Sequence, residues 1–128
     1  MMSPTSRTLE WLREQGYTAA VTEHWNPHVG IRQDLFGCLD ILAVCGPLTV
    51  GVQATSDNGG NMSARVKKIH GLPGAKAWLT GDTRQLWVVA WRQHMKAENG
   101  KKWRCRVIDV RLEDLEEAAD GQAVTVDS

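Results

Sequence analysis

Apolar residues recur along the chain with helical spacing in some segments and strand spacing in others. A first helix is expected to begin at Ser3-Pro4, a capping residue followed by a proline suited to the first turn, and to end at Gly16. Residues 17–25 then predict a strand, and a loop is expected to follow as far as about residue 33.

Two apolar runs, residues 38–44 and 48–55, predict a hairpin because only a short turn around Gly46 separates them. Residues 86–91 are apolar at every position, which is typical of a central strand covered on both faces. Residues 102–110 alternate, which indicates a half-buried strand near an edge of the sheet. The inward side chains of that strand are expected to be those of Trp103, Cys105 and Val107.

A second helix is expected to begin at Asn61 or Ser63, and a short one to cover residues 75–79. The apolar stripe of the second helix consists of Met62, Val66 and Ile69. The order of helix, three strands, helix and two strands predicts an α/β fold, with a mixed β-sheet flanked by helices on both faces. We expect one domain over residues 1–120, closed by an acidic helix and followed by an acidic flexible tail, residues 121–128.

Charge is unevenly distributed along this chain of 128 residues, although 15 bases balance 15 acids overall. Residues 109–128 contain seven acids and one base, so the first 108 residues carry 14 bases against 8 acids. A basic body of this kind is compatible with phosphate binding. No run of eighteen apolar residues predicts a membrane span, and the first residues lack the pattern of a signal peptide. The three cysteines are expected to be small core residues of a cytoplasmic protein.

Three polar residues interrupt the apolar hairpin. Asp40 stands at the head of its first strand, and Gln53 and Thr55 share one face of its second strand. The turn at Gly46 should bring Asp40 close to Gln53. Carboxylate and amide oxygens suit Mg²⁺, which lowers the pKa of a bound water and screens phosphate charge.

The motifs "DLFGCLDILAV" and "VGVQAT", followed by "SARVKKI", resemble those of the PD-(D/E)XK nuclease superfamily, and most of all its small Holliday-junction-resolvase-like members. The resemblance covers about residues 8–91. It implies a restriction-endonuclease-like αβββαβ core, with Asp40 as the first motif acid and Gln53-Ala54-Thr55 at the E-x-K position. In that family the acids hold a divalent metal, and the lysine positions the attacking water.

Thr55 stands where the motif has a lysine, and a hydroxyl cannot supply the positive charge. Arg65 is the expected surrogate and Lys68 the next candidate, because both flank the apolar stripe of the second helix on one side. Together with Lys67, these bases are expected to contact DNA. Glu23 and Asp34 are candidate additional metal ligands beside Asp40 and Gln53.

Three hypotheses remain open at this point. The first is a Mg²⁺- or Mn²⁺-dependent DNA endonuclease, with branched DNA as a candidate substrate and a homodimer as a candidate assembly. The second is a catalytically inactive DNA-binding or regulatory module on the same fold, which the Q-x-T sequence leaves room for. The third is a small α/β protein with no nucleic-acid role. Fold alone does not separate them.

Overall fold

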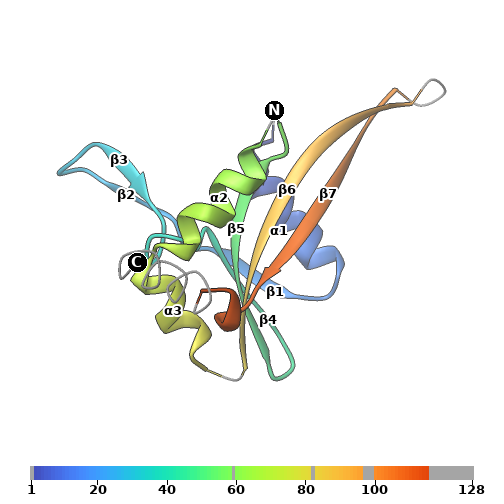
Figure 1. Cartoon of the computed structure of the whole chain (residues 1–128). Coiled ribbons are helices and arrows are strands. Elements are labelled where there is room, and N and C mark those ends of the chain that lie inside the picture. Colours follow the sequence, from blue (N-terminus) through green and yellow to red (C-terminus); the bar gives the residue numbers. More distant parts are fainter. Residues whose placement is uncertain (1, 59, 82, 97–99, 116–128) are drawn as a thin grey trace, which may run out of the picture.

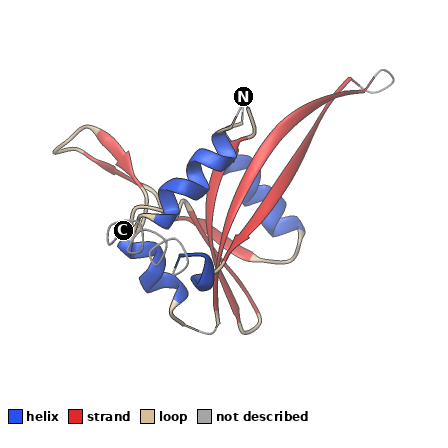
Figure 2. Ribbon diagram, viewed as in Figure 1, coloured by secondary structure: helices blue, strands red, loops and turns tan. Residues whose placement is uncertain are grey.

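A five-stranded mixed sheet forms the centre of the protein, and helices lie on both of its faces (Figures 1 and 2). The structure is a computed structural model that describes residues 2–58, 60–81, 83–96 and 100–115. Its elements are α1 (Pro4–Glu14), β1 (Thr18–Val21), β2 (His24–Asn26), β3 (Ile31–Gln33), β4 (Ile41–Cys45), β5 (Leu48–Ser56), α2 (Asn61–His70), α3 (Pro73–Leu79), β6 (Arg84–Lys96) and β7 (Gly100–Val110). The strand order in the main sheet is β1-β4-β5-β6-β7. The expected α/β class and the mixed sheet between helices are therefore confirmed.

The hairpin of β4 and β5 confirms the pairing expected around Gly46. Cys45 lies opposite Leu48, and the antiparallel register runs back to Ile41 opposite Val52. Strand β5 then pairs in parallel with β6, after a crossover through α2 and α3. Parallel neighbours need such a crossover, which explains why the helical segment comes between these two strands.

Two apolar layers cover the sheet. On one face Leu12 of α1 packs with side chains of β4, β5 and β6, among them Val52 and Trp91. On the other face Met62 and Ile69 of α2 pack with Val88 and its neighbours. The alternation along β5 and β6 explains the division, because successive side chains of a strand point to opposite faces. Of the expected stripe on α2, Met62 and Ile69 are buried and Val66 is partly buried.

The single strand expected over residues 17–25 is wrong, and so is the loop expected up to residue 33. The chain leaves the main sheet after β1, where the backbone N–H groups of Thr22 and Glu23 donate to the Asp40 carbonyl at 2.7 and 3.4 Å. Strands β2 and β3 then form a separate two-stranded hairpin that projects from the body (Figure 1). A turn over the Asn26–Gly30 segment, with a 2.8 Å backbone hydrogen bond, closes this hairpin.

Strand β7 lies at the edge of the sheet, as expected, but its inward side chains are less covered than the alternation predicts. Trp103 remains 39% exposed because β6 and β7 extend beyond the shorter strand β5 as a two-stranded arm. Val107 lies opposite Val89, next to β5, and remains 41% exposed on the edge strand. Cys105 is half-buried.

Two further expectations concern the cysteines and the chain end. Cys38 is buried, but Cys45 is exposed beside the hairpin turn, so the expectation that all three cysteines belong to the core is wrong. A helical turn is described at residues 112–115, whereas the rest of the expected acidic helix and the tail, residues 121–128, lie outside the described residues. No helix within the described part of the chain is long and apolar enough to cross a membrane.

Candidate metal centre

Three carboxylates converge at the edge of the hairpin where β4 begins. Asp40 directly precedes β4, Asp34 directly follows β3, and Glu23 directly precedes β2. One oxygen from each lies within 4.8 Å of the other two. Two oxygens bound to the same Mg²⁺ lie at most about 4.2 Å apart, so binding would require the three side chains to close by less than about 1 Å. This acidic triad therefore has the donor set and spacing to hold a metal ion.

Asp40 is the buried member of the acidic triad, with 4% of its surface exposed. Its Oδ2 atom accepts hydrogen bonds from the Gln53 Nε2 and the Ala54 backbone N–H, both at 2.8 Å. Burial, followed by the neighbouring Asp34 and Glu23, raises the pKa of Asp40 from 3.8 to about 8, although the hydrogen bond from the Ala54 N–H opposes the shift. Charged carboxylates that are buried close together are unfavourable unless a cation or a proton compensates their charge.

Gln53 lies against two members of the acidic triad and is 1% exposed. Its Nε2 donates to Asp40 at 2.8 Å and makes a longer contact of 3.4 Å with Asp34. Its Oε1 is buried and, among the described residues, accepts no hydrogen bond. An unsatisfied buried amide oxygen is costly and is typical of a site that a ligand or cation completes. Rotating the amide would direct this oxygen at the carboxylates, which is favourable only when a cation lies between them.

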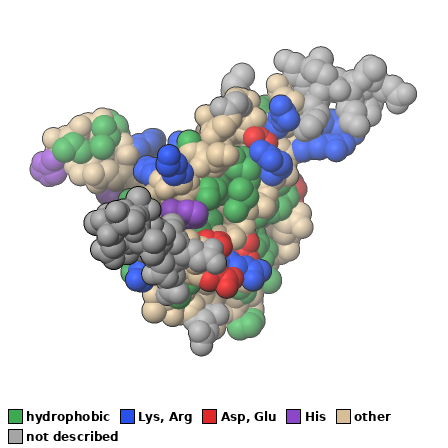
Figure 3. Space-filling view, in the orientation of Figure 1, with side chains coloured by type: hydrophobic (Ala, Val, Ile, Leu, Met, Phe, Trp, Pro, Cys, Tyr) green, Lys and Arg blue, Asp and Glu red, His purple; other side chains and the backbone are tan. Residues whose placement is uncertain are grey.

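A cleft of about 870 Å³ opens above the acidic triad. Its polar floor includes the three carboxylates together with Gln53 and Thr55, and its walls include the basic side chains of Arg32, Arg65 and Lys68. In Figure 3, Lys and Arg side chains lie on the surface between the base of the β2–β3 hairpin and α2. The arrangement places positive charge around a negative centre, as a site for a metal ion and a phosphate requires.

Of the bases expected on α2, Arg65 and Lys68 line this cleft, and Arg65 is the more buried of the two. Lys67 is exposed and is not part of the cleft lining. Thr55 is buried at the cleft floor, so the hydroxyl lies where the sequence expectation placed it. Lys68 also lowers the pKa of the nearby Cys38 thiol, which burial, Asp34 and Asp40 together raise to about 11.

Two features of the site were missed at the level of the sequence. Arg32 reaches the cleft because residues 31–33 form a strand rather than a loop. The turn residues Asn26-Pro27 and Gly30, flanked by short apolar and aromatic positions, were the available signal for that hairpin. The second feature lies next to the cleft, directly after the lining residue Ser56, where Arg106 of β7 donates two hydrogen bonds of 2.7 and 2.9 Å to Asp57.

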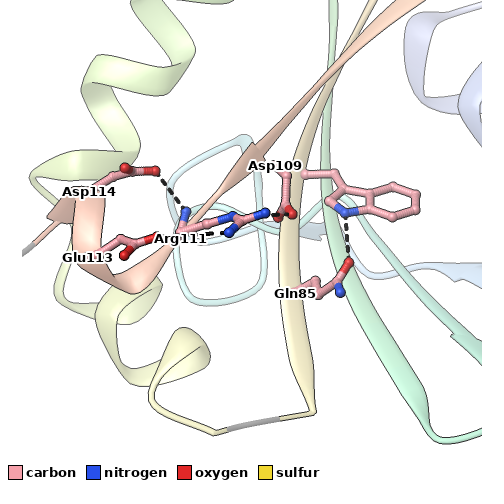
Figure 4. Close-up of polar contacts among 6 residues, drawn as sticks. Gln85, Asp109, Arg111, Glu113 and Asp114 are labelled. Carbon is pink, nitrogen blue, oxygen red and sulfur yellow. Dashed lines mark hydrogen bonds and ion pairs between the residues drawn. The ribbon is translucent and has the colours of Figure 1, made fainter.

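The other end of the sheet has a separate cavity, which shares no lining residue with the metal centre. There Arg111 lies 3.8 Å from Asp109 and 3.9 Å from Glu113, and its backbone N–H donates to Asp114 at 3.0 Å (Figure 4). Since this cavity shares no lining residue with the cleft above the acidic triad, Arg111 and Asp109 are suitable positions for control substitutions remote from that triad. Exposed pairs of this kind contribute little to stability.

Comparison of the chain with protein-family models, with curated proteins and with solved structures found no match. The assignment of a function therefore depends on the geometry of the cleft and on the motifs within it.

Proposed function

We propose that the protein is a metal-dependent DNA endonuclease of the PD-(D/E)XK type, which hydrolyses phosphodiester bonds with Mg²⁺ or Mn²⁺. The observation that carries the proposal is the acidic triad of Glu23, Asp34 and Asp40 at the floor of a cleft with basic walls. The 2.8 Å hydrogen bond between Gln53 of β5 and Asp40, directly before β4, supports the proposed motif assignment. Mg²⁺ and Mn²⁺ accept such oxygen ligands, and metal-assisted phosphoryl chemistry needs positive charge beside them.

Each side chain of the cleft has a defined task in this proposal. Asp40 is the principal metal ligand, and Glu23 and Asp34 supply further oxygens. The metal would activate a water molecule and polarise the scissile phosphate. Gln53 holds the carboxylate of Asp40 in place through its Nε2, and rotation of the amide would direct its Oε1 at the same ion instead. Arg65 replaces the missing motif lysine next to the phosphate, and Thr55 contributes a hydroxyl.

The basic surface continues from the cleft along the face of the sheet that α2 covers. Arg92 of β6 lies directly opposite Arg104 of β7 on the two-stranded arm, and both side chains are exposed. Like charges directly opposite each other destabilise a strand pair, and a polyanion on this face would offset that cost. Helix α2, which contains Lys67 and Lys68, lies between this arm and the β2–β3 hairpin (Figure 1). Duplex or branched DNA is the proposed partner, with a homodimer as the proposed assembly and the cytoplasm as the proposed location.

A second candidate function is a DNA-binding module without cleavage. It is favoured by one observation, namely that the amide nitrogen of Gln53 donates a hydrogen bond to Asp40 and so satisfies this carboxylate oxygen without a metal. Such a protein would bind DNA with strong salt dependence, because phosphate contacts release counterions, but it would not cut.

The test is incubation with linear, supercoiled and four-way-junction DNA in Mg²⁺, Mn²⁺ or EDTA, with binding followed in parallel. Cleavage in Mg²⁺ or Mn²⁺ and none in EDTA supports the endonuclease. Salt-dependent binding without cleavage in either metal supports the inactive module. Absence of both would leave the protein without a nucleic-acid role and would refute the proposal.

A further inference from the structure

The β2–β3 hairpin carries an exposed tryptophan next to an arginine of the cleft. Trp25 of β2 lies directly opposite Arg32 of β3 in the antiparallel pair. Residues opposite each other in such a pair share a face, with Cβ atoms about 5 Å apart. Arg32 lines the cleft above the acidic triad, so Trp25 lies on the hairpin face next to a residue of the cleft wall. Trp25 is 56% exposed to solvent.

Trp25 differs from the other five tryptophans of the chain. Each of those has a ring contact, a cation over its ring or a hydrogen bond from its indole N–H: they are Trp11, Trp78, Trp87, Trp91 and Trp103. Among the described residues, Trp25 has no ring partner and no acceptor for its N–H. A large aromatic ring that the fold leaves uncovered beside a functional cleft indicates a binding role.

We propose that Trp25 and Arg32 hold one nucleotide at the mouth of the cleft, so that the protein prefers DNA with unpaired bases to intact duplex. The indole ring stacks on an unpaired base, and the guanidinium of Arg32 contacts the adjoining phosphate. Stacking of this kind needs a free base face, which an intact duplex offers only at its ends. Arginine suits the second task because its planar fork matches phosphate oxygens. This inference depends on the proposed function of the cleft and specifies its substrate class.

Charge favours a nucleic acid over a second copy of this chain as the partner of Trp25. The surface around the tryptophan is basic, with Arg32 on the same hairpin face and Arg65 and Lys68 across the cleft. A polyanion complements this surface. In a symmetric dimer formed through this patch, each Arg32 would approach the basic cleft of the other copy, which is unfavourable.

The hairpin is also braced well enough to present the ring in one place. The Asn26 Nδ2 donates to the Gln33 Oε1 at 3.1 Å across the two strands. The Asn26 Oδ1 accepts from the His28 backbone N–H at 2.9 Å and fixes the turn. A braced platform loses less conformational entropy on binding than a free side chain on a loop would lose.

The experiment compares binding to two DNA molecules in EDTA, where metal-dependent cleavage does not interfere. One is an intact duplex, and the other is the same duplex with a three-nucleotide gap opposite a 2-aminopurine. We expect tighter binding to the gapped DNA and a fall in 2-aminopurine fluorescence. Trp25→Ala should lower the gapped-DNA affinity by about 5- to 150-fold, which corresponds to ~1–3 kcal/mol of stacking, and should abolish the fluorescence change. Duplex affinity should not change, and Trp25→Phe should restore part of the quenching.

Matched variants control for the loss of a surface tryptophan or arginine. Trp103→Ala removes another partly exposed tryptophan, on the face of the sheet where Arg7 of α1 lies over its ring, and should leave the preference for gapped DNA intact. Arg32→Ala should weaken binding to both DNA molecules and flatten the salt dependence by about 0.9. Arg111→Ala, remote from the cleft, should change neither quantity. Circular dichroism melting verifies that each variant is folded.

The outcomes distinguish this inference from the proposed function. Equal affinity for both DNA molecules, together with an unchanged Trp25→Ala variant, would overturn the inference and leave the endonuclease proposal standing. No binding to either DNA would overturn both. Analytical ultracentrifugation tests whether a second copy of the chain covers Trp25 instead. A wild-type dimer that Trp25→Ala dissociates, without any loss of DNA binding, would show this and would overturn the inference.

Discussion

Replacing Asp40 by asparagine should stabilise the metal-free protein, and the gain should grow with pH. Asparagine keeps an oxygen for the hydrogen bonds that Gln53 and Ala54 donate, but it removes the charge from the acidic triad. The folded protein raises the pKa of Asp40 from 3.8 to about 8, mainly by burial. Between these values the folded state binds more protons than the unfolded state, so the free energy of unfolding falls as pH rises.

The magnitude follows from the width of this pH window. Each pH unit well inside it costs the wild-type protein about 1.4 kcal/mol. Because half of the Asp40 carboxyl groups are already deprotonated at pH 8, the total cost between pH 6 and pH 8 is about 2 kcal/mol. Asparagine carries no charge at any pH and removes this contribution. For a domain of this size, the difference in melting temperature between Asp40→Asn and wild type should therefore widen by about 8 °C over the two units.

The assay is thermal melting in EDTA at pH 6, 7 and 8, repeated with Mg²⁺. At a concentration a hundred times its dissociation constant, Mg²⁺ adds about 2.7 kcal/mol to the free energy of unfolding of the wild type and much less to that of Asp40→Asn. The difference in stability between the two proteins should therefore narrow or change sign. Asp109→Asn, a partly exposed carboxylate at the other end of the sheet, is the matched control and should follow the wild type. If Asp40→Asn is less stable than wild type in EDTA at pH 8, with the same pH slope, then Asp40 is not a strained carboxylate and the reasoning fails.

Three further predictions test neighbouring parts of the structure. Gln53→Glu should tighten Mg²⁺ binding in calorimetry, since a carboxylate adds an attraction to the ion of at least ~1 kcal/mol at about 4 Å. The added charge should also lower the stability of the protein in EDTA, where no ion offsets it. Unchanged Mg²⁺ affinity in a folded variant would show that Gln53 does not face the ion. Lys68→Ala should reduce cleavage more than Lys67→Ala, because Lys68 lines the cleft and Lys67 does not. Each variant should lower the salt slope of DNA binding by up to about 0.9. An equal loss of cleavage in the two variants would contradict the placement of α2. A thiol reagent should modify the exposed Cys45 rapidly and the buried Cys38 only on unfolding, because burial and the nearby Asp34 and Asp40 raise the pKa of Cys38 to about 11. Peptide mass spectrometry would identify which cysteine is modified at each time.

The sequence was sufficient to predict the frame of the fold, because the relevant segments have strong periodicity. Residues 86–91 are apolar throughout, and β6 is central and buried on both faces at Val88 and Val89. The pairing of Asp40 with Gln53 followed from the short turn at Gly46 and the alternation of side chains. These predictions depend only on local patterns and on one tight turn.

The parts that could not be predicted depend on long-range contacts. The interruption between β1 and β2 arises because Thr22 and Glu23 donate to the carbonyl of Asp40, some seventeen residues further along the chain. The same contact brings Glu23 into the acidic triad, which the sequence could suggest only as a candidate. The exposure of Trp103 depends on how far β6 and β7 extend beyond β5, a length that alternation does not encode.

The central claim is that the acidic triad cleaves DNA by holding a divalent metal. The most direct test is the initial rate at which the protein nicks supercoiled plasmid in Mn²⁺, measured for wild type, Asp40→Asn and the control Asp109→Asn. We predict cleavage by wild type and Asp109→Asn and at least a hundredfold lower rate for folded Asp40→Asn, since loss of the principal ligand costs metal affinity and several kcal/mol of charge stabilisation. Cleavage by folded Asp40→Asn at the wild-type rate would contradict the account.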